Sequence, residues 1–181
     1  MSKIIDKETV LEIFYIHPNQ WYHVRELSRL LKISPTTISN YLHSFAGERL
    51  LEQKAERRHL LFKANTENTP FKTKKIQHNL EKIQKSGLLE FLEGELNFPK
   101  VIILFGSYAK GENAPGSDID LFILTETEKE PNLNAFIKKL GAEIQLFLYS
   151  TTKFKTMKKK NPGLFNTIVN GIKLSGFIDV A

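Results

Sequence analysis

Two apolar runs with a pair of aspartates between them constrain this chain more than any other feature of its sequence. Residues 101–105 and 121–124 are short enough to be buried strands, and Asp118 and Asp120 stand directly before the second run. Side chains alternate between the two faces of a strand, so we expect both aspartates on one face at one edge of a sheet. Two carboxylates this close repel each other, which raises the pKa of one of them unless a cation lies between them. The pattern therefore predicts a divalent metal site.

The composition restricts the ligands that such a metal site can have. The chain contains no cysteine, which excludes disulfides and thiolate zinc sites, and its five histidines lack the spacing of metal ligands. The donors must then be oxygen atoms, which favour Mg²⁺ or a similar hard cation.

A Gly-Ser pair follows the first apolar run. Gly106 and Ser107 predict a turn at the end of the strand, where backbone N–H groups and the serine hydroxyl can hold a phosphate, particularly if a helix opens at Tyr108. A metal site and a phosphate site at one sheet edge together indicate nucleoside triphosphate chemistry.

The stretch from Gly106-Ser107 to Asp118-Ile-Asp120 resembles the signature of the DNA polymerase β superfamily of nucleotidyltransferases, especially the minimal nucleotidyltransferases of prokaryotes. The resemblance implies an α/β domain with a mixed sheet flanked by helices. It also implies transfer of a nucleoside monophosphate, with AMP as the expected group, from ATP or another nucleoside triphosphate to an acceptor hydroxyl.

The same resemblance implies roles for individual residues. Asp118 and Asp120 would be catalytic and would bind Mg²⁺. Lys110 stands where relatives often have arginine and can supply a positive charge to the phosphates. The nucleotide-binding residues implied in this way are Gly106, Ser107, Lys110 and Ser117.

The superfamily usually adds a third carboxylate from a later strand, which helps to deprotonate the acceptor. In residues 141–150, GAEIQLFLYS, Glu143 and Gln145 fall on one face, and by spacing Gln145 is the closer match to the usual aspartate. A glutamine cannot act as a base. If Glu143 is the third catalytic carboxylate, the chain transfers nucleotide; if it is not, the chain can bind nucleotide without transferring it efficiently.

The first third of the chain predicts a second kind of domain. Apolar periodicity and capping residues predict helices over 6–16, 24–32 and 35–46, followed by strands at 50–53 and 59–64 around a basic turn. One face of the third helix is apolar and the other carries uncharged donors and acceptors, which suit base edges in a major groove. The candidate DNA-binding residues are Thr36, Thr37, Asn40 and His43 on this helix, with Arg57 and Arg58 in the turn for phosphate contacts.

Residues 24–42, VRELSRLLKISPTTISNYL, resemble the winged helix-turn-helix DNA-binding domains of many bacterial and archaeal regulators. The alternative is a winged helix that serves as a protein-interaction or dimerisation module, with the polar face of the third helix as plain solvent surface. The net charge of +6 suits a polyanionic partner without identifying one.

We therefore expect two domains, a winged helix-turn-helix over 1–66 and a nucleotidyltransferase domain over 67–181 that opens with a helical segment at 71–96. No apolar run approaches the roughly 20 residues of a membrane span, and no signal peptide is evident, so we expect a cytoplasmic protein without a membrane partner.

Two functions fit these expectations. The first is a Mg²⁺-dependent nucleotidyltransferase tethered to DNA. The second is a DNA-binding regulator whose degenerate transferase domain binds nucleotide or a partner protein without efficient catalysis. A small helical partner protein follows from family analogy alone, and a homodimer would suit paired DNA half-sites.

Overall fold

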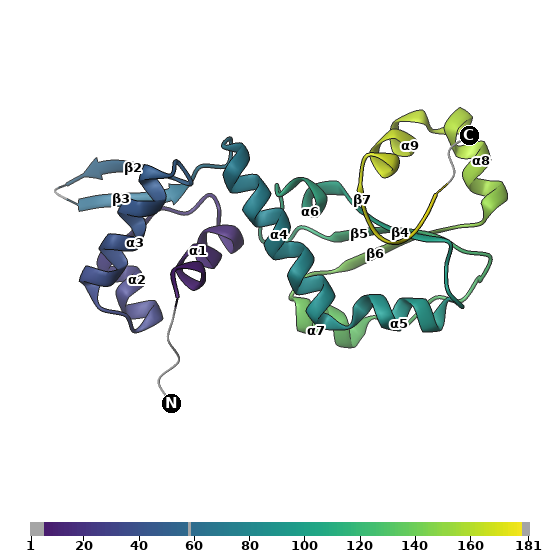
Figure 1. The fold of residues 1–181 in the computed structure, drawn as a ribbon, viewed down its shortest axis with the longest axis horizontal. Coiled ribbons are helices and arrows are strands. Elements are labelled where there is room, and N and C mark those ends of the chain that lie inside the picture. The colour runs from purple at the N-terminus through teal and green to yellow at the C-terminus, as the bar shows by residue number, and fades with distance from the viewer. Residues whose placement is uncertain (1–5, 58, 179–181) are drawn as a thin grey trace. The chain divides into compact units, whose positions relative to one another are not determined.

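The computed structural model describes residues 6–57 and 59–178, and its contacts divide the chain into two compact units, Met1–Lys75 and Ile76–Ala181. The two units are described separately below, with the labels of Figure 1. No helix in the described parts of the chain has the length and apolar character needed to cross a membrane.

The N-terminal unit combines helices with an antiparallel sheet. Its helices are α1 (Lys7–Ile16), α2 (Val24–Leu31) and α3 (Pro35–Gly47). Its strands β1 (Tyr22–His23), β2 (Leu51–Glu56) and β3 (His59–Ala64) form a sheet of order β1-β3-β2. The core packs the apolar faces of all these helices against Phe62 of β3.

Local sequence explains where these helices begin and end. The Ser34 side chain accepts a hydrogen bond from the backbone N–H of Thr37, and Pro35 takes the first position of α3, where a missing N–H costs nothing. Lys32 ends α2 with a left-handed backbone (φ 58°), so the chain turns at once towards α3. The start of the helix predicted over 35–46 is confirmed.

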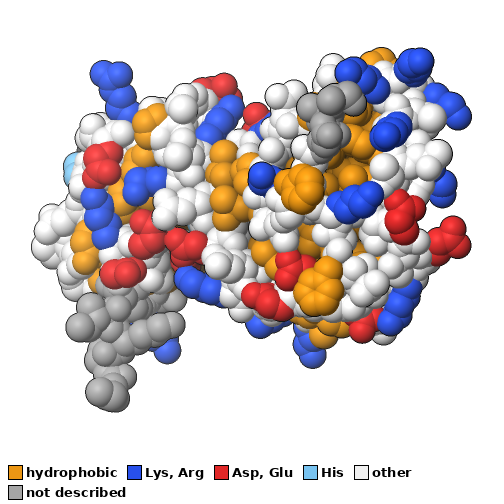
Figure 2. All heavy atoms as spheres, turned by 45° about the vertical axis from the view of Figure 1, so that its right-hand side comes forward, with side chains coloured by type: hydrophobic (Ala, Val, Ile, Leu, Met, Phe, Trp, Pro, Cys, Tyr) orange, Lys and Arg blue, Asp and Glu red, His pale blue; other side chains and the backbone are white. Residues whose placement is uncertain are grey.

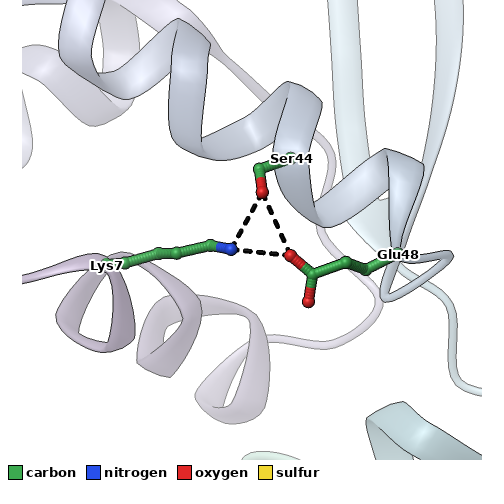
Figure 3. A network of polar contacts seen from close by, with 3 residues as sticks. All are labelled: Lys7, Ser44 and Glu48. Atoms are coloured by element: carbon green, nitrogen blue, oxygen red, sulfur yellow. Dashed lines mark hydrogen bonds and ion pairs between the residues drawn. The ribbon is translucent and has the colours of Figure 1, made fainter.

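An ion pair fixes the end of α3 on α1. Figure 3 shows Lys7 reaching from α1 to Ser44 and Glu48, with its Nζ 2.9 Å from the Ser44 hydroxyl and 2.6 Å from Glu48 Oε1. Both charged groups are partly exposed, so this contact is worth at most about 1 kcal/mol. Ser44 is therefore engaged within the fold and is not part of the free polar surface of α3.

The hairpin differs from the expected one. β2 continues to Glu56, and residues that the sequence assigned to the turn pair in register with β3, with Lys54 opposite Leu61 and Glu56 opposite His59. The connection is therefore the short one that suits the twist of paired strands. Of its two arginines, Arg57 has φ 45°, and Arg58 lies outside the described residues.

Helix α4 (Thr69–Ser86) begins slightly before the helical segment that the sequence predicted over 71–96. The Asn68 side chain accepts a hydrogen bond from the Phe71 N–H, which stabilises the helix start, and Phe71 packs beside Tyr15 in the N-terminal core. The division between the two compact units falls after Lys75, within α4.

The C-terminal unit is a mixed sheet with helices on both faces. Its further helices are α5 (Leu88–Glu95), α6 (Gly106–Lys110), α7 (Asn134–Leu140), α8 (Thr151–Lys160) and α9 (Pro162–Val169). Its strands are β4 (Val101–Phe105), β5 (Ile119–Leu124), β6 (Ile144–Tyr149) and β7 (Ile172–Gly176), in the order β6-β5-β4-β7. β4 is antiparallel to β5 and β7, whereas β5 and β6 are parallel, so the expected mixed α/β sheet is confirmed.

Strand β7 follows closely after the end of α9. α9 ends at Val169, and the chain then passes so close to β4 that a Cβ on Gly171 would lie 2.5 Å from the Leu104 carbonyl oxygen. Only glycine permits this approach. Ile172 and Leu174 then alternate with polar residues, which is the period of a strand and not of a helix.

Because side chains alternate between the two faces of each strand, the sheet contributes to two separate hydrophobic cores, one on each face. Leu104, Leu121 and Ile123 belong to the core on the side of α5 and α7. Phe105 and Phe122 belong to the core with residues of α8 and α9, and Figure 1 shows these helices on the opposite side of the sheet from α5 and α7. Asp120 and Phe122 are two residues apart in β5, so their side chains lie on the same face of the sheet. The side chain of Asp120 therefore projects towards α8 and α9.

Candidate active site

The two aspartates meet at the edge where β5 begins. Asp118 immediately precedes the strand, and Asp120 lies within it, opposite Phe105 of β4. Both are half-buried. Partial burial, together with the negative charge of Asp118, raises the pKa of Asp120 above its usual value. The edge thus holds unfavourable negative charge that a cation would relieve.

Gly106 lies directly against Asp120. Its backbone is left-handed (φ 69°), and an added Cβ would fall 2.1 Å from Asp120 Oδ2. A larger residue would therefore have to adopt a disfavoured backbone and displace the carboxylate. The sequence predicted a turn at Gly106 but not this contact, because the contact depends on the pairing of β4 with β5.

The other predicted nucleotide-binding residues occupy different positions around the turn. Ser107 is half-buried in α6, and Lys110 is exposed at the helix end. Ser117 uses its hydroxyl to accept a hydrogen bond from the Ala114 N–H, while its own N–H donates to the Ala114 carbonyl. Ser117 therefore stabilises the turn that directly precedes Asp118.

A buried asparagine on α4, which was not a candidate from the sequence, supports this loop. Asn79 Nδ2 lies 3.0 Å from the Tyr108 carbonyl oxygen and 2.9 Å from Asn113 Oδ1. Asn79 and Asn113 are both buried, so breaking these hydrogen bonds would leave polar groups that water cannot reach without a hydrogen-bond partner. The signal that could have identified Asn79 is its polar side chain on a face of α4 that is otherwise buried.

The position expected for a third carboxylate is occupied by an amide. Gln145 of β6 lies opposite Asp120, and its Nε2 donates to Asp118 Oδ2 at 2.7 Å. Glu143 precedes β6 and is exposed; its carbonyl accepts from the Ile119 N–H. No cluster of three or more histidine, aspartate or glutamate side chains suited to a metal occurs among the residues described. Two carboxylates are nevertheless enough for Mg²⁺, which commonly completes its shell with water and substrate phosphates.

A cavity of about 270 Å³ opens beside Gly106. It lies between α6 and α9, and its lining includes Asn166, Thr167 and Asn170. None of these was a candidate from the sequence. The signal that could have found them is their helical spacing, which places polar side chains together on α9 beside the buried Phe165 and Ile168.

The N-terminal candidates share part of one helix face. Thr36, Asn40 and His43 are exposed on α3 at spacings that bring them to the same side. Thr37 is half-buried, and its hydroxyl lies 2.8 Å from that of Ser34. His43 Nδ1 is 2.7 Å from the Ser39 carbonyl oxygen, which orients its ring.

Positively and negatively charged side chains both occur on the surface of the molecule. Figure 2 shows Lys and Arg side chains interspersed with Asp and Glu over the face in view. The net charge of +6 therefore does not mark one basic patch on that face.

Comparison with known proteins finds a similarity for the C-terminal unit. Residues 85–174 match the family model of the nucleotidyltransferase domain. This range contains the Gly-Ser turn, both aspartates, Gln145 and the α9 residues of the cavity. No curated protein and no solved structure matches the chain significantly. Residues 85–174 are thus similar to nucleotidyltransferase domains.

Proposed function

We propose that the C-terminal unit moves a nucleoside monophosphate, with AMP as the expected group, from a Mg²⁺-bound nucleoside triphosphate to an acceptor hydroxyl. The observation that carries the proposal is the half-buried Asp118–Asp120 pair, with Asp120 seated directly against the Gly106 turn. The carboxylates thus lie beside the turn that we propose to bind phosphate, and metal-assisted phosphoryl chemistry requires both groups together.

The residues fit a magnesium ion because both aspartates offer hard oxygen donors at one edge. When bound, Mg²⁺ would offset the charge that develops on the phosphates. Gln145 holds the Asp118 carboxylate in place through its amide. Ser107 and Lys110 would orient the phosphates, Ser107 through its hydroxyl and Lys110 through its charge.

In the proposed reaction the acceptor oxygen forms a bond to the α-phosphorus, and the bond from that phosphorus to pyrophosphate breaks. The acceptor proton passes to a base, for which Glu143 is the candidate carboxylate near the site. The amide of Gln145 cannot accept that proton. Its position opposite Asp120 favours a second candidate function, in which the domain senses nucleotide without efficient transfer.

The test of the proposal is a calorimetric titration of the full chain with each nucleoside triphosphate, with and without Mg²⁺. Metal-dependent binding supports the proposal, and its absence in the wild type contradicts it. Incubation with labelled triphosphate then separates the two candidates, since only the transferase forms a labelled acceptor and releases pyrophosphate.

Replacing Gln145 by glutamate should raise Mg²⁺ affinity and increase transfer by about 100-fold or more, because it adds a carboxylate that can hold metal and accept a proton. The same change should lower the melting temperature of the metal-free protein, because a third negative charge joins the pair. Calorimetry and labelled transfer measure both effects.

Gln84→Glu is the matched control, because Gln84 is an exposed residue of α4 and the substitution adds the same charge. If Gln145→Glu and Gln84→Glu behave alike towards Mg²⁺, position 145 does not contribute to the metal site.

We propose in addition that the N-terminal unit is a winged helix-turn-helix that binds DNA. Two features support this: α2 and α3 are joined by a tight turn at Lys32, and α3 exposes Thr36, Asn40 and His43 on one side. Amide and hydroxyl groups on such a face can read base edges, and Arg57 in the β2–β3 connection can contact phosphate.

Asn40→Ala should relax DNA sequence preference, with a loss of about 1–3 kcal/mol for the preferred site, because it removes a base-reading amide. Arg57→Ala should weaken binding to all DNA sequences alike. It should also reduce the slope of log affinity against log salt concentration by about one unit, because one phosphate contact is lost. Sequence selection followed by fluorescence anisotropy at several salt concentrations measures both effects.

The controls are Asn19→Ala and Lys74→Ala, which remove an exposed amide and an exposed charge elsewhere in the same unit. Specific binding that survives Asn40→Ala unchanged would assign base reading to a different surface.

A further inference from the structure

We infer that the cavity between α6 and α9 receives the base of the nucleoside triphosphate and selects adenine through Asn166. This inference rests on the proposed function, because it extends the same site from the phosphates to the base.

The first support is position. Phe105 and Gly106 line the cavity, and these two residues are also the ones that adjoin Asp120: Phe105 as its partner in the β4–β5 pairing, and Gly106 through the close approach of its backbone. The cavity and the carboxylates lie on the same side of the sheet, because Asp120 projects towards the α8–α9 side and α9 forms one wall. A nucleotide whose phosphates lie at the Gly106 turn therefore has this cavity within reach.

The second support is the chemistry of the lining. Among the described residues that line the cavity, Lys110 alone is charged, and it stands on the α6 side. The α9 side offers neutral amides and a hydroxyl, while Phe105 and Ala109 add apolar surface. Phosphates favour cationic partners, whereas a base needs an apolar surface for its ring and amide groups for its edge. The lining is thus suited to phosphate at one end and to a base at the other.

The third support is the hydrogen bonding of the polar side chains on α9. Asn170 Nδ2 donates to the Asn166 carbonyl oxygen at 2.8 Å, and the Thr167 hydroxyl donates to the Gly163 carbonyl at 3.0 Å. Both side chains are thus engaged with their own helix. The Asn166 side chain makes no hydrogen bond within the described part of the chain, so its donor and its acceptor are both available.

An asparagine amide with a free donor and a free acceptor matches adenine in particular. Its oxygen can accept from the N6 amino group while its nitrogen donates to N7, the bidentate pairing used for adenine in other recognition contexts. The cavity, at about 270 Å³, has the size of a small-molecule subsite and not of a macromolecular acceptor groove. The geometry therefore favours a base over a protein or nucleic-acid acceptor as its occupant.

The experiment compares Mg²⁺ complexes of ATP, GTP, CTP and UTP, together with inorganic tripolyphosphate, by titration calorimetry on the full chain. In the wild type we expect ATP to bind about tenfold more tightly than the other triphosphates, in line with one good bidentate pair. Asn166→Ala should remove that preference and leave the affinity for tripolyphosphate unchanged.

Asn134→Ala is the matched control, because Asn134 is an exposed helical asparagine of the same unit that does not line the cavity. Asn166→Asp keeps the size of the side chain but loses its donor, so it should also abolish the ATP preference. Since Asn166 is exposed, neither substitution at this position should disturb folding, which circular dichroism checks.

The outcomes separate this inference from the function on which it rests. If the wild type binds neither triphosphates nor tripolyphosphate, the proposed function fails, and the inference with it. If triphosphates bind with Mg²⁺ but Asn166→Ala retains the wild-type preference, or if the preferred base is not adenine, the inference alone is overturned.

Discussion

Replacing Asp118 and Asp120 together by asparagine should abolish Mg²⁺-dependent nucleotide binding and reduce transfer by at least about 1,000-fold. The reason is that both metal-binding carboxylates are lost, and electrostatic stabilisation of this kind is often the largest catalytic contribution. Asparagine retains the size of aspartate, so the sheet edge keeps its packing. Titration calorimetry and labelled transfer measure the two losses.

The same double substitution should raise the melting temperature of the protein without metal. The folded pKa of Asp120 lies above its unfolded value, so this residue contributes stability while it is protonated, and that contribution is lost as the pH rises through the folded pKa. At neutral pH the ionised pair therefore destabilises the metal-free fold, and asparagine removes the charge. Scanning calorimetry with and without Mg²⁺ should show that the ion stabilises the wild type and not the variant.

The control is the double variant Glu128→Gln/Glu130→Gln, which changes the net charge by the same amount at exposed positions of the same unit. It should retain both Mg²⁺ dependence and nucleotide binding. An equal loss of binding in this control would attribute the effect to overall charge and contradict the assignment of the site.

Gly106→Ala should destabilise the C-terminal unit and also abolish metal-dependent binding. The left-handed backbone alone costs a non-glycine residue about 1–2 kcal/mol. A Cβ placed 2.1 Å from Asp120 Oδ2 must in addition displace the carboxylate. Chemical denaturation measures the free energy of unfolding, and titration with Mg²⁺ and triphosphate measures the loss of the site.

Gly141→Ala separates these two effects. Gly141 has nearly the same left-handed backbone (φ 70°), but an added Cβ there meets no atom within 4 Å. It should therefore show the backbone penalty without loss of binding. If Gly106→Ala is no worse than Gly141→Ala in stability and binds nucleotide normally, the contact between Gly106 and Asp120 has no functional role.

The local features of this fold were predictable from the sequence, because they depend on neighbouring residues. The Ser34 cap and the strand 101–105 each follow from spacing within a few residues. The common orientation of Asp118 and Asp120 needs only the alternation of a strand. These features required no knowledge of what lies across the sheet.

The remaining features depend on segments that are distant in sequence. Gln145 reaches Asp118 only because β5 and β6 pair in a particular register, and a shift of one residue would have turned its side chain to the other face. The cavity needs α9 to return against β4, which the close approach of Gly171 permits. Strand β7 follows this return and pairs with β4.

The amide at position 145 affects how many metal ions the proposed site can hold. Asp118 and Asp120 carry two negative charges between them, which one divalent cation neutralises, and Gln145 adds none. A second ion would have to be held largely by the phosphates of the substrate. On the proposed function, the two aspartates would therefore hold one divalent cation when no nucleotide is bound.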